Sequence, residues 1–319
     1  MKAAKRALNL LNKQLENRRL KKVGLSLDYP HENNVFIFSD PRGGSTWLTE
    51  VILKILKGYE VLWEPLYFNE DEELKKLNFD RRPYIPEDRE WPEALDAIDN
   101  ILKGKALNVW TMSMSNTEDI KKANGLIVKM CRGNASVPWI VRNFKTKLKP
   151  IYMIRHPFAV ASSQINWPAW DYEKVQFNVP EVPNNEIYSE HAKFLSTIEY
   201  IDEELVALWC ITNSIALSNP KNNIDWITIN YEEMVMNPAE TLRRVLNAWD
   251  LLDVDIDGIV DFHKPSSTSL DSSAIKGASQ VEQWTNRLTT DQIKRMKRVL
   301  DYFQIDWYSS DPYPMVVFS

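Results

Sequence analysis

The stretch DPRGGSTWL, residues 40–48, lies between an apolar run, NNVFIFS, and an amphipathic segment, TEVILKIL. The run before it predicts a buried strand, and the segment after it predicts a helix. A glycine-rich turn between a strand and a helix gathers backbone N–H groups and the positive end of the helix around an anion. Gly43 and Gly44 permit close approach of the backbone. The stretch therefore predicts an anion-binding turn, with a plain strand–helix turn and a capped helix as the alternative.

Other side chains of the turn indicate what kind of loop it is. Arg42 adds a permanent charge, and Ser45 and Thr46 place hydroxyls in the first turn of the helix. The loop does not fit the nucleoside-triphosphate pattern G-x-x-x-x-G-K-[ST], because it has no Gly-Lys pair. Instead, the basic residue precedes the glycines, and an aromatic residue, Trp47, follows the hydroxyls.

Outside this turn, short strands alternate with longer helices along the chain. Apolar runs predict strands at 35–39, 60–63, 126–130, 150–155 and 225–230. Helical periodicity follows the first strand and recurs at roughly 190–217, 242–249 and 293–303. Near-continuous apolar strands that alternate with helices predict a single α/β domain, with a mainly parallel central sheet flanked by helices on both faces.

Two segments interrupt this alternation and are predicted to run over the surface. Residues 69–100 are charged and contain prolines, and residues 166–190 are rich in Trp, Pro and Asn. In such a fold these excursions lie near the carboxyl ends of the strands, where ligands bind. We therefore place the substrate loops at 64–92 and 166–190. Their tryptophans either stack on sugar rings or serve packing alone; they are Trp63, Trp91, Trp167 and Trp170.

Composition limits the class of protein. The chain has 319 residues, a net charge of −5 and two cysteines, so neither a nucleic-acid partner nor a disulfide framework is expected. Residues 1–30 are predicted to form a basic accessory helix, with contact to a membrane surface or a partner as the alternative, and residues 31–319 are predicted to form the α/β domain. No apolar run approaches the roughly 18 residues that span a bilayer. We expect a cytoplasmic protein, and oligomeric state is left open.

The anion-binding turn resembles a loop of a known family. DPRGGSTWL is similar to the 5′-phosphosulfate loop of the sulfotransferases that use 3′-phosphoadenosine-5′-phosphosulfate (PAPS), usually P-[RK]-S-G-[ST]-[ST]-[WF]. The resemblance implies a P-loop-like fold in which Arg42 contacts the phosphosulfate, Ser45 and Thr46 bond its oxygens, and Trp47 packs against adenine. Gly43 stands where the family normally has serine, which removes one donor but leaves the backbone N–H.

A second anion motif lies in YMIRHPFAVASSQINW, residues 152–167. A strand is predicted to end at Arg155, and Pro157 suits the first position of a new helix. Ser163 lies eight residues beyond the arginine, so both reach one ligand only if strand end and helix fold back on each other. An arginine at a strand end is often a surface ion pair. The pattern R-x-P-x-x-x-x-x-S, however, resembles the family's 3′-phosphate motif, which implies that role for Arg155 and Ser163.

A later cluster, IKGASQVEQWTNRL at 275–288, resembles the family's loop that closes over the nucleotide. The resemblance implies that Lys276 and Gly277 contact the 3′-phosphate. Trp284 either helps that closure or anchors the last helix in the core.

The general base is the next expected part of the site. Cytosolic small-molecule sulfotransferases carry a histidine in a K-[TS]-H context, where this chain has LIVKMCRGN with Cys131. Glu64, in YEVLWEPLYF, is predicted to end a buried strand, and Pro65 turns the chain there. Carbohydrate O-sulfotransferases have a similar strand-Glu-Pro-aromatic stretch, which implies Glu64 as general base. The alternative is that Glu64 only caps or orients a neighbouring loop.

Together these resemblances extend from about Val35 to Ile305. They imply a PAPS-dependent sulfotransferase that acts on a hydroxyl of a carbohydrate or another polar acceptor, with Arg42 also stabilising the charge that develops in the reaction. No metal is expected, since no His/Cys/Asp cluster has ligand spacing. The alternatives are a sulfotransferase-like nucleotide-binding protein without turnover and, in another class, a P-loop kinase.

Overall fold

A computed structural model describes residues 2–67, 71–79, 82–166, 175, 177–262, 264–268 and 277–318. Its strands are β1 (Val35–Ser39), β2 (Tyr59–Trp63), β3 (Gly125–Met130), β4 (Ile151–Ile154) and β5 (Ile227–Asn230). The helices that build the domain around them are α2 (Ser45–Ile55), α4 (Pro92–Leu102), α6 (Val137–Asn143), α7 (Pro157–Ile165), α10 (Ile201–Leu217), α11 (Tyr231–Met236), α12 (Pro238–Ala248) and α15 (Thr290–Phe303).

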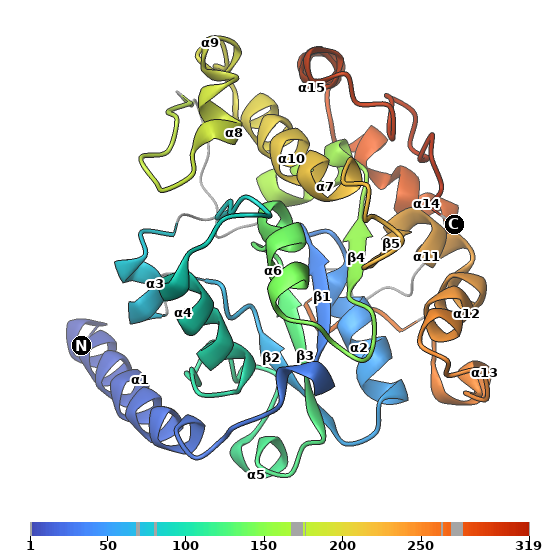
Figure 1. Ribbon diagram of the computed structural model, residues 1–319. Helices are drawn as coiled ribbons and strands as arrows, with labels where there is room; N and C mark the ends of the chain where they lie inside the picture. The colour runs from blue at the N-terminus through green and yellow to red at the C-terminus, as the bar shows by residue number, and fades with distance from the viewer. Residues whose placement is uncertain are drawn as a thin grey trace.

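The strands form one five-stranded sheet in the order β2-β3-β1-β4-β5, and every pair is parallel (Figure 1). In the centre, Phe38 of β1 pairs with Met130 of β3 on one side and with Tyr152 of β4 on the other. The chain therefore leaves β1 at the point where strand order reverses, which is where open α/β sheets bind ligands. The expected fold class, a parallel sheet with flanking helices, is confirmed.

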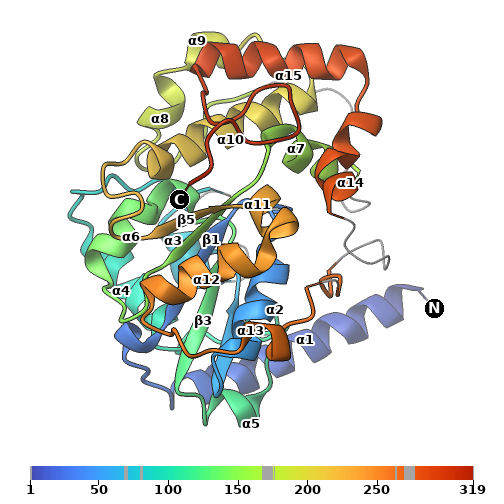
Figure 2. The same ribbon diagram turned by 90° about the vertical axis from the view of Figure 1, so that its right-hand side faces the viewer.

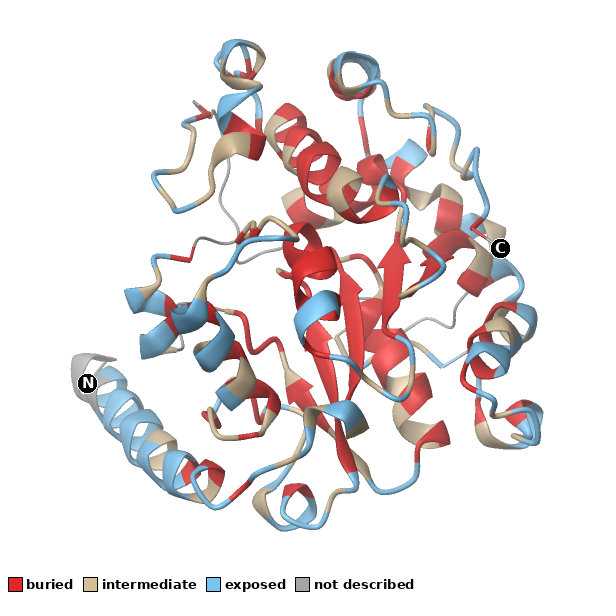
Figure 3. Ribbon diagram, viewed as in Figure 1, coloured by how far each residue is buried: buried red, intermediate tan, exposed pale blue. Residues whose placement is uncertain are grey.

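Helices cover both faces of the sheet (Figure 2). On one face, α2, α11 and α12 pack over Val35 and Ile37. On the other, α6, α7 and α10 pack over Phe36 and Phe38, and α15 lies along α10. Because alternate side chains of a strand point to opposite faces, both sets of side chains in β1 are buried (Figure 3). Burial on both faces explains why the strands are apolar without interruption.

The prediction of one long helix over residues 190–217 is wrong for its N-terminal part. Short helices α8 (Glu186–Ser189) and α9 (Ala192–Leu195) precede α10, which begins only at Ile201. Tyr200 has an extended backbone, with φ −126° and ψ 146°, and this separates α9 from α10. The apolar period continues across the break because Leu195 and Ile198 are buried in the same core as α10.

The segment 69–100 is also more than a surface excursion. It forms α3 (Glu72–Lys76) and α4, and it buries Leu74, Ile85 and Ile98 in the main core. Its charged residues alternate with these apolar ones, so composition alone did not reveal the amphipathic pattern.

The N-terminal helix α1 (Lys2–Gly24) is held to the domain by its second half (Figure 2). Leu20 is buried, and the Asn17 side chain accepts a hydrogen bond from the N–H of Val109. Leu8 and Leu11, nearer the N-terminus, are exposed. Among the described helices, none combines the length and the apolar character needed to cross a bilayer.

Candidate active site

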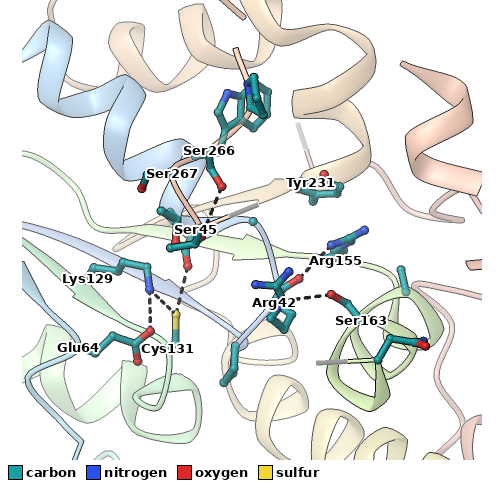
Figure 4. A pocket seen from close by; sticks show the side chains of 18 of the residues that line it. Arg42, Ser45, Glu64, Lys129, Cys131, Arg155, Ser163, Tyr231, Ser266 and Ser267 are labelled. Carbon is teal, nitrogen blue, oxygen red and sulfur yellow. Dashed lines mark hydrogen bonds and ion pairs between the residues drawn. The ribbon is translucent and has the colours of Figure 1, made fainter. Parts of the chain in front are cut away.

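A cavity of about 1320 Å³ opens at the carboxyl ends of β1, β2, β3 and β4 (Figure 4). It brings together most of the residues that the sequence predicts for the site: Arg42, Gly44, Ser45, Thr46, Trp47, Glu64, Arg155 and Ser163. Gly43 lies in the same loop. Lys276 lies outside the described residues. Figure 4 shows Arg42, Arg155 and Ser163 on one side of Ser45 and Glu64, Lys129 and Cys131 on the other.

The backbone of the turn is shaped for an anion. Arg42 has φ 69° and Gly44 has φ 96°, so both lie in the left-handed region, before α2 begins at Ser45. A methyl group at Gly44 would lie 2.4 Å from Cδ2 of Tyr231. Left-handed geometry alternating with helical backbone directs successive N–H groups to one side. Arg42 adopts this strained geometry without being glycine, which is typical of residues held for function.

Gly43 is fixed by its neighbours as well. A Cβ at this position would lie 2.2 Å from Oγ of Ser39 and 2.9 Å from the carbonyl oxygen of Asp40. Ser39 Oγ is buried and has no hydrogen-bond partner among the described residues. The space that a serine would need at position 43 is therefore taken by the hydroxyl of Ser39, which accounts for the departure from the family pattern.

The two predicted anion motifs meet in one place. Arg155 donates from Nη1 to the carbonyl oxygen of Arg42 at 3.0 Å, and Nε of Arg42 donates to Oγ of Ser163 at 3.0 Å. The sheet explains this meeting, because β4 lies beside β1 and the residues that follow two neighbouring parallel strands share one edge. Pro157 begins α7, as expected, and α7 returns Ser163 to the loop.

This end of the cavity is strongly positive. Burial lowers the pKa of Arg42 from its ordinary value, and the nearby charge of Arg155 adds to that effect. The guanidinium of Arg155 lies 4.2 Å from the centre of the Tyr231 ring, a cation–π contact. Its Nε is buried without a partner among the described residues. A buried donor without an acceptor costs about 1–3 kcal/mol, so the site is suited to an anion that accepts from it.

The opposite end of the cavity is built around Glu64. Glu64 follows β2, has φ 43° and donates its N–H to the carbonyl oxygen of Lys129 at 2.8 Å. Its Oε1 accepts from Nζ of Lys129 at 2.6 Å, and its Oε2 accepts from Nη1 of Arg132 at 2.7 Å. Both carboxylate oxygens are therefore held by cations. Glu64 lies directly after the last residue of β2 and lines the cavity, and its role as base stays a prediction.

The neighbours of Glu64 and Cys131 determine which of these two groups is charged. Burial would raise the pKa of Glu64, but Lys129 and Arg132 outweigh burial and hold the pKa below its ordinary value. Burial, and then the Glu64 charge, raise the pKa of the Cys131 thiol to about 11. Cys131 is therefore a neutral thiol at pH 7, and it lies between Lys129 Nζ at 3.0 Å and Ser45 Oγ at 3.1 Å. Through these contacts, the Glu64 cluster touches the anion-binding loop.

Aromatic rings line the same end. Nζ of Lys129 lies 3.9 Å from the centre of the Trp63 ring, and the rings of Tyr67 and Trp110 lie 5.2 Å apart. The indole N–H of Trp110 donates to the carbonyl oxygen of Glu64 at 3.2 Å. Trp91, by contrast, packs against Phe79 and does not line the cavity, so of its two interpretations the structure supports packing. Trp167 and Trp170 lie outside the described residues.

The late segment forms one wall. Gly277, with φ 57°, precedes α14 (Ala278–Val281), which continues into a 3₁₀ helix, η4 (Glu282–Asn286). Trp284 is buried and stacks on the ring of His156 at 4.8 Å, yet it also lines the cavity. The packing of Trp284 agrees with the core-anchor interpretation, and its role in closing over a nucleotide stays a prediction. Arg287, which follows η4, lines the cavity as well.

No histidine of the described chain lines the cavity. His156 is buried, and its Nε2 lies 2.9 Å from the carbonyl oxygen of Asp311. Burial lowers the pKa of His156 to about 3, so its ring is neutral. His31 and His191 lie elsewhere, and His263 lies outside the described residues.

The cavity residues that the sequence analysis missed include three cations, Lys129, Arg132 and Arg287, and the ring of Tyr231. Lys129 had a signal, since a lysine within an otherwise apolar strand is seldom buried without a partner. The others required knowledge of which strands are neighbours. Among the described residues, no group of three or more His, Cys, Asp or Glu side chains is arranged to hold a metal ion.

Comparison with known proteins gives similarity in structure only. No protein-family model matches the sequence, and no curated protein matches it. Similar solved structures include a mouse sulfotransferase, SULT7A1, complexed with PAP, at 15% identity and a TM-score of 0.46, covering 91% of this chain and 90% of that chain. A sulfotransferase domain from the curacin biosynthetic pathway gives 16% identity and a TM-score of 0.44, covering 85% and 97%.

Retinol dehydratase in complex with retinol and PAP gives 15% identity and a TM-score of 0.42, with 89% of this chain and 84% of that chain covered. Identities and TM-scores this low assign no function to this chain.

Proposed function

We propose that the chain is a PAPS-dependent sulfotransferase that transfers a sulfuryl group to a hydroxyl of a carbohydrate or another polar acceptor. One observation carries the proposal: the two anion motifs, far apart in the sequence, meet through the contact between Arg155 and Arg42 in a single cavity. A ligand with anionic groups at two ends fits two anion motifs that share one cavity. A simple strand–helix turn would not require a second arginine beside it.

The charges of the cavity support this assignment. Glu64 is the only acidic residue among the described residues that line it, and Glu64 already pairs with Lys129 and Arg132. Arg155 lines the cavity as well, and its buried Nε has no hydrogen-bond partner among the described residues. A ligand that brings several negative charges would therefore complete the electrostatics of the site.

In the proposed reaction, the acceptor oxygen forms a bond to the sulfur of PAPS while the bond from sulfur to the bridging phosphate oxygen breaks. Negative charge grows on that bridging oxygen, and Arg42 with the loop N–H groups is placed to stabilise it. A single preorganised donor of this kind contributes about 3 kcal/mol. The products are the sulfated acceptor and 3′-phosphoadenosine-5′-phosphate (PAP), with the hydroxyl proton released to a base.

Glu64 is the proposed base. Its carboxylate lies beside the loop, linked to it through Lys129 and Cys131, and its lowered pKa keeps it ionised and able to accept a proton. Lys129 and Arg132 also weaken it as a base, because they favour the charged form. The negative charge of bound PAPS would oppose that effect and raise the pKa of Glu64.

The acceptor end favours molecules with a ring face. Trp63, Tyr67 and Trp110 offer aromatic surface beside Glu64, and aromatic side chains bind the flat faces of rings, sugars included. This placement supports an acceptor whose hydroxyl projects from a ring toward Glu64.

Isothermal titration with PAP tests the donor assignment. Wild-type protein should bind PAP with micromolar affinity, and Arg155→Ala should reduce that affinity at least tenfold, because hydrogen bonds to charged groups contribute about 1.5–3 kcal/mol. Arg243→Ala, which removes an exposed arginine that does not line the cavity, serves as the control. If wild-type protein binds no PAP, the proposal is wrong.

A second candidate is a nucleotide-binding protein without turnover, and one observation favours it: both oxygens of Glu64 are already held by cations. Turnover of PAPS with a panel of hydroxyl acceptors separates the two candidates. Turnover that Glu64→Gln abolishes supports the enzyme, whereas PAP binding without turnover on any acceptor supports the binding protein.

A further inference from the structure

Arg287 follows η4 at the edge of the cavity that also holds Arg42 and Arg155. It belongs to the cluster at 275–288 that resembles the family's late loop, but that resemblance gives roles only to Lys276, Gly277 and Trp284 and none to Arg287. The charge of Arg287 nevertheless acts on the anion site. The pKa of Arg42 is lowered first by burial and then by the charge of Arg155, and the charge of Arg287 lowers it further.

The backbone that carries Arg287 is firmly anchored. Trp284 stacks on His156 and makes an edge contact with Phe158 at 5.3 Å, and the N–H of Arg287 donates to the carbonyl oxygen of Trp284 at 3.0 Å. Further back along the segment, Nε2 of Gln280 donates to the hydroxyl of Tyr231 at 2.5 Å. Little backbone entropy therefore remains to be lost when Arg287 engages a ligand.

Arg287 has no carboxylate partner among the described residues, unlike the arginines of the neighbouring helix α15. There, Arg295 pairs with Asp202 at 2.8 Å and Arg298 with Glu203 at 2.8 Å. An exposed arginine at the rim of a positive cavity, with no acid beside it, adds repulsion to the empty site. That repulsion becomes attraction once an anion is bound.

We propose that Arg287 is a third anion-binding arginine of the site and that it contacts the 3′-phosphate of the nucleotide. This inference rests on the proposed function. The choice of the 3′-phosphate follows from packing: Phe158, which Trp284 contacts, belongs to α7, and α7 carries Ser163, one of the two residues predicted to hold that phosphate.

The test compares two nucleotides that differ only in the 3′-phosphate. Titrations with PAP and with adenosine 5′-phosphate are made on wild-type protein, Arg287→Gln, Arg287→Lys and the control Arg243→Gln. We expect Arg287→Gln to weaken PAP binding about tenfold and to leave adenosine 5′-phosphate binding within about twofold, since one charged hydrogen bond is lost. Arg287→Lys should keep most of the PAP affinity, and Arg243→Gln should match the wild type.

The possible failures are distinguishable. Wild-type binding of PAP together with equal PAP binding by Arg287→Gln would overturn the contact and leave the proposed function intact. An equal loss with both nucleotides would place the arginine at the 5′ end and overturn the 3′ assignment. Wild-type protein that binds no PAP would overturn the proposed function, and this contact with it.

Discussion

Arg155 supports the backbone of Arg42: its Nη1 donates to the Arg42 carbonyl oxygen at 3.0 Å, and Arg42 has a left-handed φ of 69°. A left-handed residue other than glycine costs roughly 1–2 kcal/mol. Arg155 therefore helps to hold the turn and is also predicted to bind the 3′-phosphate. Binding of that phosphate is thus expected to depend on the same side chain that stabilises the conformation of the loop.

This double role predicts that charge alone at position 155 is not sufficient. Arg155→Lys keeps the charge, but a single ammonium cannot replace the guanidinium that reaches both the Arg42 carbonyl and a phosphate. We expect PAP affinity to fall about tenfold, measured by isothermal titration. Arg243→Lys is the matched control, and an Arg155→Lys variant with wild-type affinity would show that Arg155 acts only through its charge.

Gly43→Ser restores the residue usual in the family loop, and we nevertheless expect it to be harmful. Its Cβ would collide with Ser39 Oγ and crowd the Asp40 carbonyl, and overpacking of this kind costs about 1–3 kcal/mol. Urea unfolding should show that loss of stability, and PAP affinity should fall. Adding Ser39→Ala should restore part of both, because it removes the closer of the two contacts. Gly43→Ser alone with unchanged stability would contradict the explanation.

Glu64→Gln should leave PAP affinity within about threefold and lower kcat about 10²–10⁴-fold, as expected when a general base is lost. The change leaves Lys129 and Arg132 without their anion, so thermal unfolding is measured on the same sample. Glu64→Ala with added formate provides a second measurement, since an external carboxylate should restore part of the rate. A Glu64→Gln variant with full turnover would exclude Glu64 as base.

The lowered pKa of Glu64 also predicts a pH profile. A base with a pKa below its ordinary value of 4.5 stays ionised as the pH falls, so kcat/KM for PAPS should show no acidic limb between pH 8 and pH 5 from this group. The measurement is initial rate against pH with saturating acceptor. An acidic limb centred near neutral pH, present in the wild type and absent from Glu64→Gln, would contradict this assignment.

His156 predicts how stability depends on pH. The pKa of His156 in the folded protein is about 3, below the ordinary value of 6.5. Between these two pH values the imidazole is therefore protonated in the unfolded chain and neutral in the folded chain. The stability due to neutral His156 is complete above pH 6.5 and is lost as pH falls toward 3, by about 2 kcal/mol at pH 5.

The measurement is urea unfolding at pH 7 and pH 5 on the wild type and on His156→Gln. The comparison separates His156 from buried carboxyls such as Glu232, because both proteins contain those carboxyls. Burial raises the pKa of Glu232, so its contribution to the pH dependence of stability has the opposite sign. The wild type should lose about 2 kcal/mol more than the variant between the two pH values. Equal losses in both proteins would show that His156 is protonated in the folded state.

Much of this architecture could be predicted from the order of residues. Apolar runs located the strands, and the rule that parallel strands present their carboxyl ends together accounts for the meeting of Arg155 with the loop. The ion pairs of Glu64 could not be predicted in the same way. They depend on β2 lying beside β3 in a register that pairs Trp63 with Lys129, and nothing local in either strand specifies that register.

The break before α10 escaped prediction for a different reason. Periodicity detects which side chains face a core, and Leu195 and Ile198 do face it, but extended backbone at Tyr200 leaves no trace in that pattern. In residues 69–100 the many charges and prolines indicate a surface segment, although the apolar residues of α4 follow a helical period.

Among the described residues, four indoles line the cavity, those of Trp47, Trp63, Trp110 and Trp284. Trp63 and Trp110 contact the Glu64 cluster, whereas Trp284 precedes Arg287 in the late segment. Indole fluorescence changes when the ring's surroundings change, so the chain carries its own unlabelled optical reporters of occupancy. Single Trp→Phe replacements would make each reporter silent in turn. Filling of the two ends could then be followed separately in one stopped-flow trace, which would show which molecule arrives first.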